Sequence, residues 1–308
     1  MRVAPPTWKL WTALGIVYVV WGSTYLAIRY AVTSLPPLTS ASVRYALAAG
    51  LLGGYLLLRR GRGALRASRR QYAHAAVIGL LLLLGGNGGV NLAEKRGLPS
   101  GLTALLVASV PLWVVLLRLL ARDRPSGQTL VGVAVGFGGV AVLLAPGSRG
   151  GVASTGAALL VLMASLLWSI GSFLSGRLDL PDDPLLGAVV QMAGGAVGLA
   201  LCAALLGERV QWDQVQTSSL LAVGYLIVFG SVVAFTAYAW LLRVAPVSKV
   251  STYAYVNPLV AVLLGAAFVG ESLTALSVFG GALTLVAVAL VVGQAPDEEH
   301  GRERSSAT

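Results

Sequence analysis

Long apolar runs separated by short polar connections make up most of the sequence. An α-helix needs about 20 mostly apolar residues to cross the hydrocarbon core of a bilayer. Ten runs are predicted to do so: Leu10–Tyr30, Leu38–Leu58, Tyr72–Leu92, Leu98–Leu120, Thr129–Leu144, Thr155–Ser175, Leu185–Leu206, Ser218–Leu242, Val247–Val269 and Leu273–Val292. Helix is the expected form because backbone N–H and C=O groups in lipid must find partners within the protein. The pattern predicts an all-α integral membrane protein with ten transmembrane helices.

The second half of the chain repeats the first at an offset of 147 residues. At this offset the segment Pro246–Leu264 lies over Pro99–Leu117 without a gap, and Trp168 lies over Trp21. Self-similarity at a fixed spacing indicates a chain built from related units. We therefore predict two repeats, residues 1–150 and 151–293, followed by a polar, disordered cytoplasmic tail at 294–308.

The number of helices in each repeat determines how the two halves are oriented. Five is odd, so the second repeat enters the membrane in the opposite direction to the first. Inverted repeats of this kind place a substrate site near the bilayer midplane, between the halves, and permit alternating access. Among the inferences from pattern alone, this one bears most directly on function.

Composition and charge agree with a membrane protein. Hydrophobic residues make up 56% of the 308 positions and charged residues 11%, against about 25% charged in a typical soluble domain. The formal net charge of +10 would suggest nucleic-acid binding in a soluble protein. Here the basic residues lie in short connections between apolar runs, so topology explains them and no nucleic-acid partner is expected.

The connection after the second helix is rich in arginine. It contains Arg59, Arg60, Arg62, Arg66, Arg69 and Arg70. Placing it in the cytoplasm leaves sixteen Lys and Arg residues on that side and five on the other, as the positive-inside rule favours. Both termini of the multi-pass chain are then cytoplasmic. A lipid head-group or partner site is the alternative explanation of the cluster.

No constellation typical of an enzyme is found in the sequence. There is no HExxH motif, Cys/His cluster, Walker A loop or Ser/His/Asp set. No catalytic residue, metal site or cofactor is therefore predicted. The twelve carboxylates fall at helix ends, in connections or in the tail. No acidic group is expected in the membrane interior, where a proton-coupled pump usually keeps one.

Arg44 is the exception among the charged residues, because it lies inside a predicted helix, seven residues after Pro37. A charge there costs at least about 2.5 kcal/mol unless it is paired or faces water. It is either a cavity-lining cation for a substrate carboxylate or phosphate, or a structural guanidinium. In the second case it hydrogen-bonds helix carbonyls or stacks on Trp21 or Tyr25. Its counterpart in the second repeat is Gln191, which is polar and neutral.

Pro111 and Pro258 occupy equivalent positions in the two repeats and are predicted to lie mid-helix. A proline there removes one helical hydrogen bond and frees the carbonyl four residues earlier, that of Val107 or Ala254. Neighbouring helices must cover this defect, or it opens into a cavity. The prolines are thus candidate gating hinges beside the transport pathway, with a simple packing kink as the alternative.

Aromatic and polar side chains gather inside several predicted spans. Such groups are typical of a mainly apolar binding site with a few placed polar contacts. The alternative is hydrogen bonding between helices. The candidate substrate-binding residues are Trp21, Thr24, Arg44, Asn87, Asn91, Trp168, Tyr238, Tyr253 and Asn257.

Two glycine patterns are also present. The run Gly85-Gly86-Asn87-Gly88-Gly89 has no counterpart in the second repeat. It is either a flexible break in the third helix or a close-packing surface. Gly132 and Gly136 form a GxxxG pair in the fifth helix, which predicts packing within the bundle.

Several of these residues resemble a known family. WGSTYLAIRY at residues 21–30, the following Leu35-Pro36-Pro37 and the pair Arg44-Tyr45 resemble the opening of an EamA-type member of the drug/metabolite transporter superfamily. The two proline-marked helices and Gly270-Glu271 are similar to that family's repeat unit. The resemblance covers nearly all of residues 8–292. One departure is Arg122-Asp123-Arg124, which stands where the family has a Gly-Glu pair.

The resemblance implies a ten-helix carrier that exports small metabolites, often amino acids, across a bacterial inner membrane. It implies a central cavity lined by helices one to four and six to nine, with helices five and ten at the periphery. Trp21, Arg44 and the Pro111 and Pro258 helices would border this cavity. A small-molecule substrate and the bilayer are the expected partners of a monomeric chain. A membrane-embedded enzyme and a channel or scaffold are the alternatives.

The predicted topology can be tested by cysteine labelling. With Cys202 replaced by Ser, single cysteines in the Arg59–Arg70 connection should react with a membrane-impermeant maleimide only from the cytoplasmic side. A cysteine at Arg209, on the opposite predicted side, is the control and should show the reverse pattern. Labelling of the arginine-rich connection from outside intact cells would contradict the topology.

Overall fold

A computed structural model describes residues 7–123, 125–145, 155–245, 250 and 252–306, without the side chains of 239, 242–244 and 293–306. The first half of the described chain contains α1 (Thr7–Ser34), α2 (Pro37–Arg60), α3 (Arg69–Gly79), α4 (Gly89–Lys95), α5 (Ser100–Val107), α6 (Val110–Leu120) and α7 (Gly127–Leu144). The second half contains α8 (Thr155–Ser175), α9 (Pro184–Leu205), α10 (Thr217–Tyr225), α11 (Ala234–Val244), α13 (Tyr253–Val269) and α14 (Ala275–Ser306). Two short 3₁₀ turns, η1 (Arg62–Leu65) and η3 (Trp212–Gln214), and two π-helical segments, η2 (Leu80–Gly88) and η4 (Leu226–Val233), complete the described elements.

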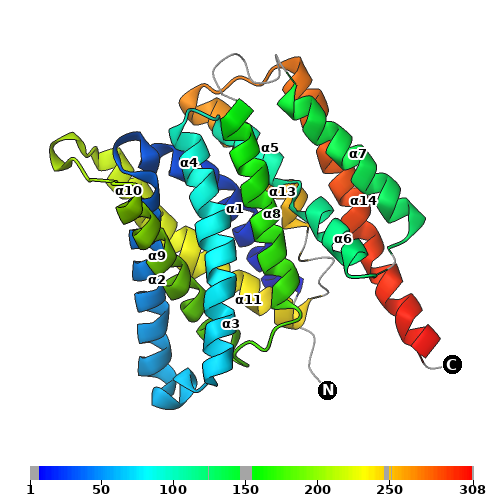
Figure 1. The fold of residues 1–308 in the computed structure, drawn as a ribbon, viewed down its shortest axis with the longest axis horizontal. Coiled ribbons are helices and arrows are strands. Elements are labelled where there is room, and N and C mark those ends of the chain that lie inside the picture. The colour runs from blue at the N-terminus through cyan, green and yellow to red at the C-terminus, as the bar shows by residue number, and fades with distance from the viewer. Residues whose placement is uncertain (1–6, 124, 146–154, 246–249, 251, 307–308) are drawn as a thin grey trace.

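The regular secondary structure of the described residues is all helical and confirms the predicted class of a ten-helix membrane protein (Figure 1). Nine of its helices, counting joined segments as one, are long and apolar enough to cross a membrane. The tenth, α13, is apolar but shorter. It covers the later part of the predicted run Val247–Val269, and residues 246–249 and 251 of the duplicated stretch lie outside the described residues.

The two halves are inverted relative to each other, as the contacts between α2 and α9 demonstrate. These helices are equivalent in the repeat. The Glu208 carboxylate, just after α9 ends, accepts hydrogen bonds from the backbone N–H groups of Leu38 and Thr39 at the start of α2, at 3.1 and 2.8 Å. At the other end, Arg60 of α2 forms an ion pair with Asp183, which precedes α9. Equivalent helices therefore run in opposite directions.

The fourth span is broken, which corrects the prediction that Pro111 lies mid-helix. Residues 108–109 interrupt the span between α5 and α6, and Pro111 lies in the first turn of α6. Proline is tolerated there because its missing N–H needs no helical partner. Pro258, its counterpart, does lie inside the continuous helix α13.

The third and eighth spans each contain a π-helical segment at nearly the same position of the repeat. The third joins α3, η2 and α4, and the eighth joins α10, η4 and α11. The two segments differ in sequence, LLLLLGGNG against LIVFGSVV. The irregular backbone is thus duplicated although the glycine run is not. π-helical turns within α-helices occur often at functional sites.

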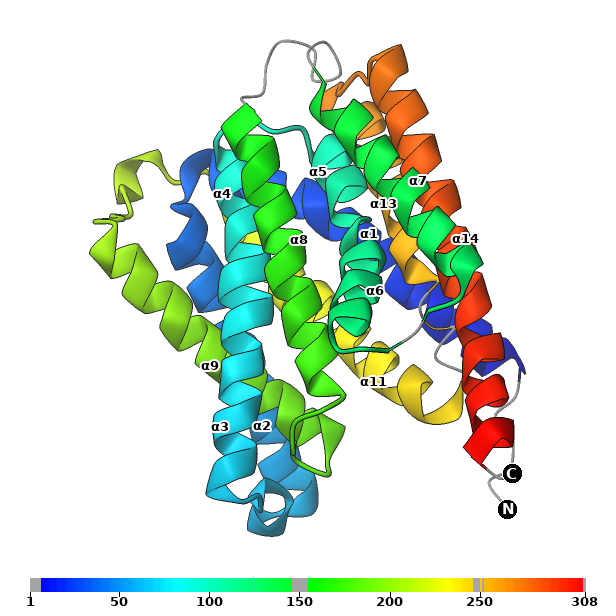
Figure 2. The same cartoon turned by 45° about the vertical axis from the view of Figure 1, so that its right-hand side comes forward.

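The glycine-rich third span packs closely against α8 and α9, and Figure 2 shows it running beside α8. A Cβ atom on Gly79 would lie 2.0 Å from the Gln191 carbonyl oxygen, and one on Gly86 would lie 2.7 Å from a Trp168 ring carbon. The glycine run therefore forms a packing surface and contains part of the π-helical break. The close-packing interpretation is confirmed.

Helices α7 and α14 pack against each other at one edge of the bundle (Figure 1). Gly132 and Gly136 of α7 permit this approach, since a Cβ atom on Gly132 would lie 2.9 Å from Val291 Cγ2 and one on Gly136 would lie 3.2 Å from the Ala287 Cβ atom. The GxxxG pair thus serves packing within the bundle, as predicted. Helix α14 continues to Ser306, where the sequence predicted a disordered tail from residue 294. The composition past Val292 includes alanine, glutamate and arginine, which favour helix.

The close approach of the third span to α9 predicts a specific sensitivity. Gly79→Ala should lower the free energy of unfolding by about 1–3 kcal/mol, because the added methyl meets backbone atoms that cannot rotate away. The measurement is an unfolding titration in mixed detergent micelles. Gly54→Ala is the matched control, because a Cβ atom there meets nothing within 4 Å. Equal stability of the two variants would contradict the packing described.

Candidate functional site

A cavity of about 960 Å³ lies between the two halves. Both halves line it, through α1, α2 and the third and fourth spans on one side and α8, α9, the eighth span and α13 on the other. Its size is in the range of small-molecule sites, which run from about 300 to 1,000 Å³. The bulk of the lining is apolar or aromatic, with a few polar groups. This is the candidate binding site.

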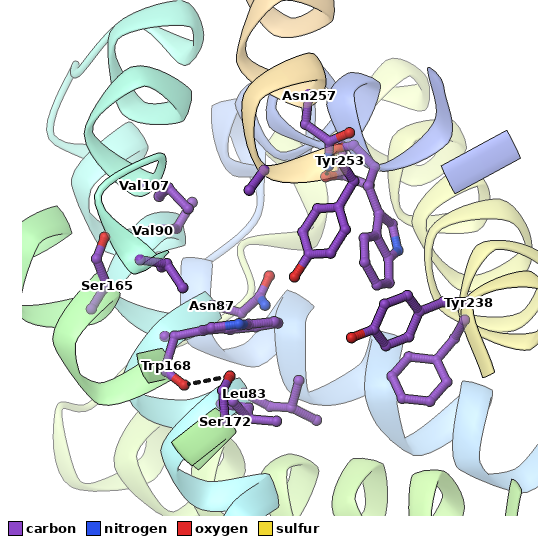
Figure 3. A pocket seen from close by; sticks show the side chains of 18 of the residues that line it. Leu83, Asn87, Val90, Val107, Ser165, Trp168, Ser172, Tyr238, Tyr253 and Asn257 are labelled. Atoms are coloured by element: carbon purple, nitrogen blue, oxygen red, sulfur yellow. Dashed lines mark hydrogen bonds between the residues drawn. The ribbon is translucent and has the colours of Figure 1, made fainter. Parts of the chain in front are cut away.

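Three aromatic rings form one wall of the cavity. The Trp21 ring centre lies 5.0 Å from that of Tyr238 and 5.2 Å from that of Tyr253, and the two tyrosine rings are 5.8 Å apart. In Figure 3 the hydroxyl groups of Tyr238 and Tyr253 point toward the middle of the cavity, with Trp168 across from them. The wall thus offers ring edges and hydroxyl groups together.

Arg44 lies in the cavity lining with 6% of its surface exposed. Its Nε donates a hydrogen bond to the Ser231 hydroxyl at 2.9 Å. Its guanidinium carbon lies 4.7 Å from the centre of the Tyr45 ring, which is a cation–π contact. The observed aromatic partner is therefore the neighbouring tyrosine, where the structural interpretation had named Trp21 or Tyr25.

The π-helical segment η4 holds Arg44 and the aromatic wall in place. The Gly230 carbonyl accepts a hydrogen bond from the Trp21 indole N–H at 3.2 Å, and the next residue, Ser231, receives Arg44. A Cβ atom on Gly230 would lie 3.2 Å from both Arg44 Nη2 and Thr24 Cγ2. A larger residue at this position would push the guanidinium aside.

The charge on Arg44 is not balanced by a carboxylate in the described structure. The described residues that line the cavity include two arginines, Arg44 and Arg118, and no Asp or Glu. Arg118 forms an ion pair with Asp123 at 3.3 Å, whereas no ion pair involving Arg44 is found among the described side chains. The cavity therefore presents a positive charge suited to an anionic group.

The remaining predicted residues divide into two groups. Thr24, Asn87 and Trp168 line the cavity, and the Thr24 hydroxyl donates to the Trp21 carbonyl at 2.6 Å. Asn91 is buried outside the lining, and its amide nitrogen donates to the Asn87 carbonyl at 2.7 Å. The structure does not bring Asn91 to the site.

Asn257 and the two prolines complete the set. The Asn257 amide nitrogen faces the main-chain carbonyls of Tyr18 and Tyr253, at 3.1 and 3.3 Å. This contact fixes part of the side chain to α1. Pro111 and Pro258 both line the cavity, as do Val107 and Ala254, the residues four positions before them. The helix break before Pro111 and the proline defect within α13 therefore both adjoin the cavity.

Sequence reasoning missed some of the lining. Ser231 had no recognisable signal, because nothing in LIVFGSVV marks one serine as the partner of an arginine on another helix. Gln191 lines the cavity, and its position opposite Arg44 in the repeat is a signal that could have identified it. Thr129 of α7 and Val291 and Val292 of α14 also contribute to the lining, so helices five and ten are not wholly peripheral.

The cavity extends toward one end of the bundle. Its lining reaches Arg118 and Ser175, near the ends of α6 and α8, and Pro184 at the start of α9. In Figure 1 the α2–α3 connection and the end of α14 lie at this same end. Toward the other end the lining stops at Ile28, Val90 and Ala104.

Two carboxylates tie the halves together at the closed end. Glu271 accepts hydrogen bonds from the backbone N–H groups of Ser100 (2.7 Å) and Gly101 (3.0 Å) at the start of α5. Glu208 makes the corresponding contacts at the start of α2, including one to the Thr39 hydroxyl. A carboxylate at a helix N-terminus is stabilised by the free N–H groups and the helix dipole. Each tie joins a second-half glutamate to a first-half helix.

Glu94 is a buried carboxyl group at a helix end, and the sequence did not predict its burial. It lies in the last turn of the third span and is 1% exposed. Its position at a helix end agrees with the sequence, but burial there depends on neighbouring helices that the local sequence does not reveal.

Comparison with known proteins identifies relatives over nearly the whole chain. The EamA-like transporter family matches twice, at residues 8–145 and 155–293. The chain is 40% identical to the inner membrane transporter YedA of Escherichia coli K12 over 282 residues, which are 92% of this chain and 90% of YedA. It is 29% identical, over 94% of both chains, to a probable terminal-alkyne amino-acid exporter of Streptantibioticus cattleyicolor.

A solved structure has the same overall fold. Its TM-score is 0.62 at 21% sequence identity, and the match covers 92% of this chain and 96% of the other. Identity at this level supports the fold alone.

Proposed function

Because the chain belongs to the EamA-like transporter family of the drug/metabolite transporter superfamily, and is thus a multi-pass transporter of the bacterial inner membrane, we propose that it exports small polar metabolites of the amino-acid class by alternating access. The observation that carries the choice of substrate class is Arg44, a buried cation in the cavity without a carboxylate partner among the described residues. Substrate class, direction and mechanism are the parts we propose.

Arg44 is proposed to bind the substrate carboxylate. Its Nε is used by Ser231, which leaves the terminal nitrogens to face a ligand. A planar guanidinium matches a carboxylate with two parallel hydrogen bonds. Because the surroundings are mainly apolar, such a bond is stronger here than in water.

The aromatic wall is proposed to hold the rest of the substrate. Trp21, Tyr238 and Tyr253 provide ring surface and hydroxyl groups within reach of one ligand, and Asn87 adds an amide. A small zwitterion or polar side chain suits this mixture. The name of the Streptantibioticus relative, a probable amino-acid exporter, supports the same class.

Alternating access is supported by the asymmetry of the two ends. We propose that the open end faces the cytoplasm, because it is the end of the arginine-rich α2–α3 connection and the positive-inside rule favours that side. The opposite end is held shut by Glu208 and Glu271. The break before Pro111 and the proline in α13 are the proposed hinges.

The alternatives fit less well. A channel needs a path that is continuous through the membrane, whereas this cavity stops at Ile28 and Val90. Exchange of labelled L-amino acids in proteoliposomes discriminates between the two, since a carrier gives saturable counterflow and a channel gives flux that does not saturate. A comparison of metabolites excreted with and without overexpression would identify the substrate.

Arg44→Gln tests the binding role. In counterflow with a mixture of labelled L-amino acids, the apparent KM should rise about tenfold or more, because a charge-assisted hydrogen bond contributes about 1.5–3 kcal/mol. Protein abundance should fall much less. Arg118→Gln, an arginine of the same cavity that is paired with Asp123, is the control and should change KM less than about threefold. A lower abundance at unchanged KM would contradict the role.

Pro258→Ala tests the hinge. Restoring the N–H at this position should leave substrate binding nearly intact while it slows turnover, because the α13 backbone bends less readily. Binding is measured by ligand-dependent quenching of tryptophan fluorescence and turnover by counterflow rate. Equal loss of both would indicate a folding defect and rule out a hinge.

A further inference from the structure

Glu94 is a buried carboxyl group that does not line the central cavity and has no part in the proposed substrate site. Its side chain is 1% exposed, and neither carboxyl oxygen has a hydrogen-bond partner among the described residues. Its main-chain carbonyl, by contrast, accepts from Arg29 Nη1 at 3.1 Å and from the N–H of Gly97 at 2.9 Å. The backbone is satisfied and the side chain is not.

The nearby cations are directed to other acceptors. Arg29 donates to the Glu94 main chain, and Lys95 Nζ donates to the Val32 carbonyl at 2.8 Å. The ion pairs found in the described part of the chain do not include Glu94. A negative charge on this carboxyl would therefore be buried without a paired cation, which is strongly unfavourable.

Glu94 lies between two cavities. Val90, one helical turn earlier, and Tyr25 of α1 line the central cavity at its closed end. Glu94 itself lines a second, smaller cavity of about 220 Å³ together with Arg29, Thr33 and Lys95. The carboxyl group thus stands in the segment of protein that separates the central cavity from the far end of the bundle.

The titratable side chains of the elements packed against α4 come from α1 and α2. Within the described residues, α5, α8 and η2 carry none. Helix α1 carries Tyr25 and Arg29 within about one turn of each other, and α2 carries Arg44 and Tyr45 in the central cavity. Lys95 and Arg96 directly follow Glu94 at the end of α4. The other titratable residues of α1 and α2 are Lys9, Tyr18, Tyr30, Tyr55, Arg59 and Arg60. Glu271, whose carboxylate is held by the start of α5, and Arg29 are the charged groups that act on Glu94.

We propose that Glu94 is the proton-binding site that couples transport to the proton gradient; this rests on the proposed function. A proton from water at the closed end binds one carboxyl oxygen and makes the group neutral, which allows that end to close around it. Release of the proton toward the central cavity leaves a carboxylate. Since the carboxylate cannot remain buried without a partner, the end opens to water, and reprotonation completes the cycle. Ionisable groups buried in membrane proteins often serve such relays.

The first test does not depend on the substrate. In the purified full-length chain at neutral pH, infrared spectroscopy should detect the C=O stretch of a protonated carboxylic acid. This band should be lost in Glu94→Gln and kept in Asp213→Asn, which changes an exposed carboxylate. A Glu94→Gln spectrum that superimposes on that of the wild type would overturn the proposal.

The second test measures coupling with a mixture of labelled L-amino acids in proteoliposomes. Glu94→Gln, which mimics the protonated group, should keep counterflow near the wild-type rate. The accumulation of amino acid driven by an imposed pH gradient should fall at least about tenfold. Glu94→Asp should restore part of the response to the gradient, and Asp213→Asn should behave as wild type. Equal gradient-driven accumulation in wild type and Glu94→Gln overturns the coupling role alone. Absence of counterflow in the wild type overturns the proposed substrate class, and the infrared test still decides the proton site.

Discussion

Lipid offers no hydrogen bonds, so each break in a helix of this protein must be covered by other helices or face water inside it. The described breaks follow that constraint. The interruption between α5 and α6, Pro258 and the two π-helical segments all contribute residues to the central cavity. The irregular backbone is thus concentrated where a ligand can reach it. The irregular backbone of η4 also fixes two residues of the site, because Gly230 accepts a hydrogen bond from Trp21 and Ser231 accepts one from Arg44.

The two halves share an architecture but differ in their chemistry. Equivalent helices α2 and α9 cross in opposite directions, and each half has its π-helical segment and its proline. Yet the cation of the site is supplied by the first half and both tyrosines of the aromatic wall by the second. The glutamates that close one end also come from the second half alone. A duplicated scaffold can rock symmetrically while it presents an asymmetric surface to its substrate.

The ten spans and the inversion were predictable from the sequence, because hydrophobic length and an odd helix count depend on local pattern only. The equivalence of Trp21 with Trp168, and of Pro111 with Pro258, also followed from the 147-residue repeat. The interruption before Pro111 was not predicted, although proline chemistry explains it afterwards. Ser231, the placement of Asn91 outside the cavity and the burial of Glu94 depend on contacts between helices far apart in the chain. Those contacts leave no local signal.

The central claim is that one cavity is reached from each side of the membrane in turn. Accessibility of a single cysteine at Thr24, which lines this cavity, tests it most directly in a Cys202→Ser background. A membrane-impermeant maleimide is applied to right-side-out and inverted membrane vesicles. The account predicts labelling from both sides, slowed in each case by a saturating transported amino acid. Labelling from one side only, whatever the substrate concentration, would contradict it.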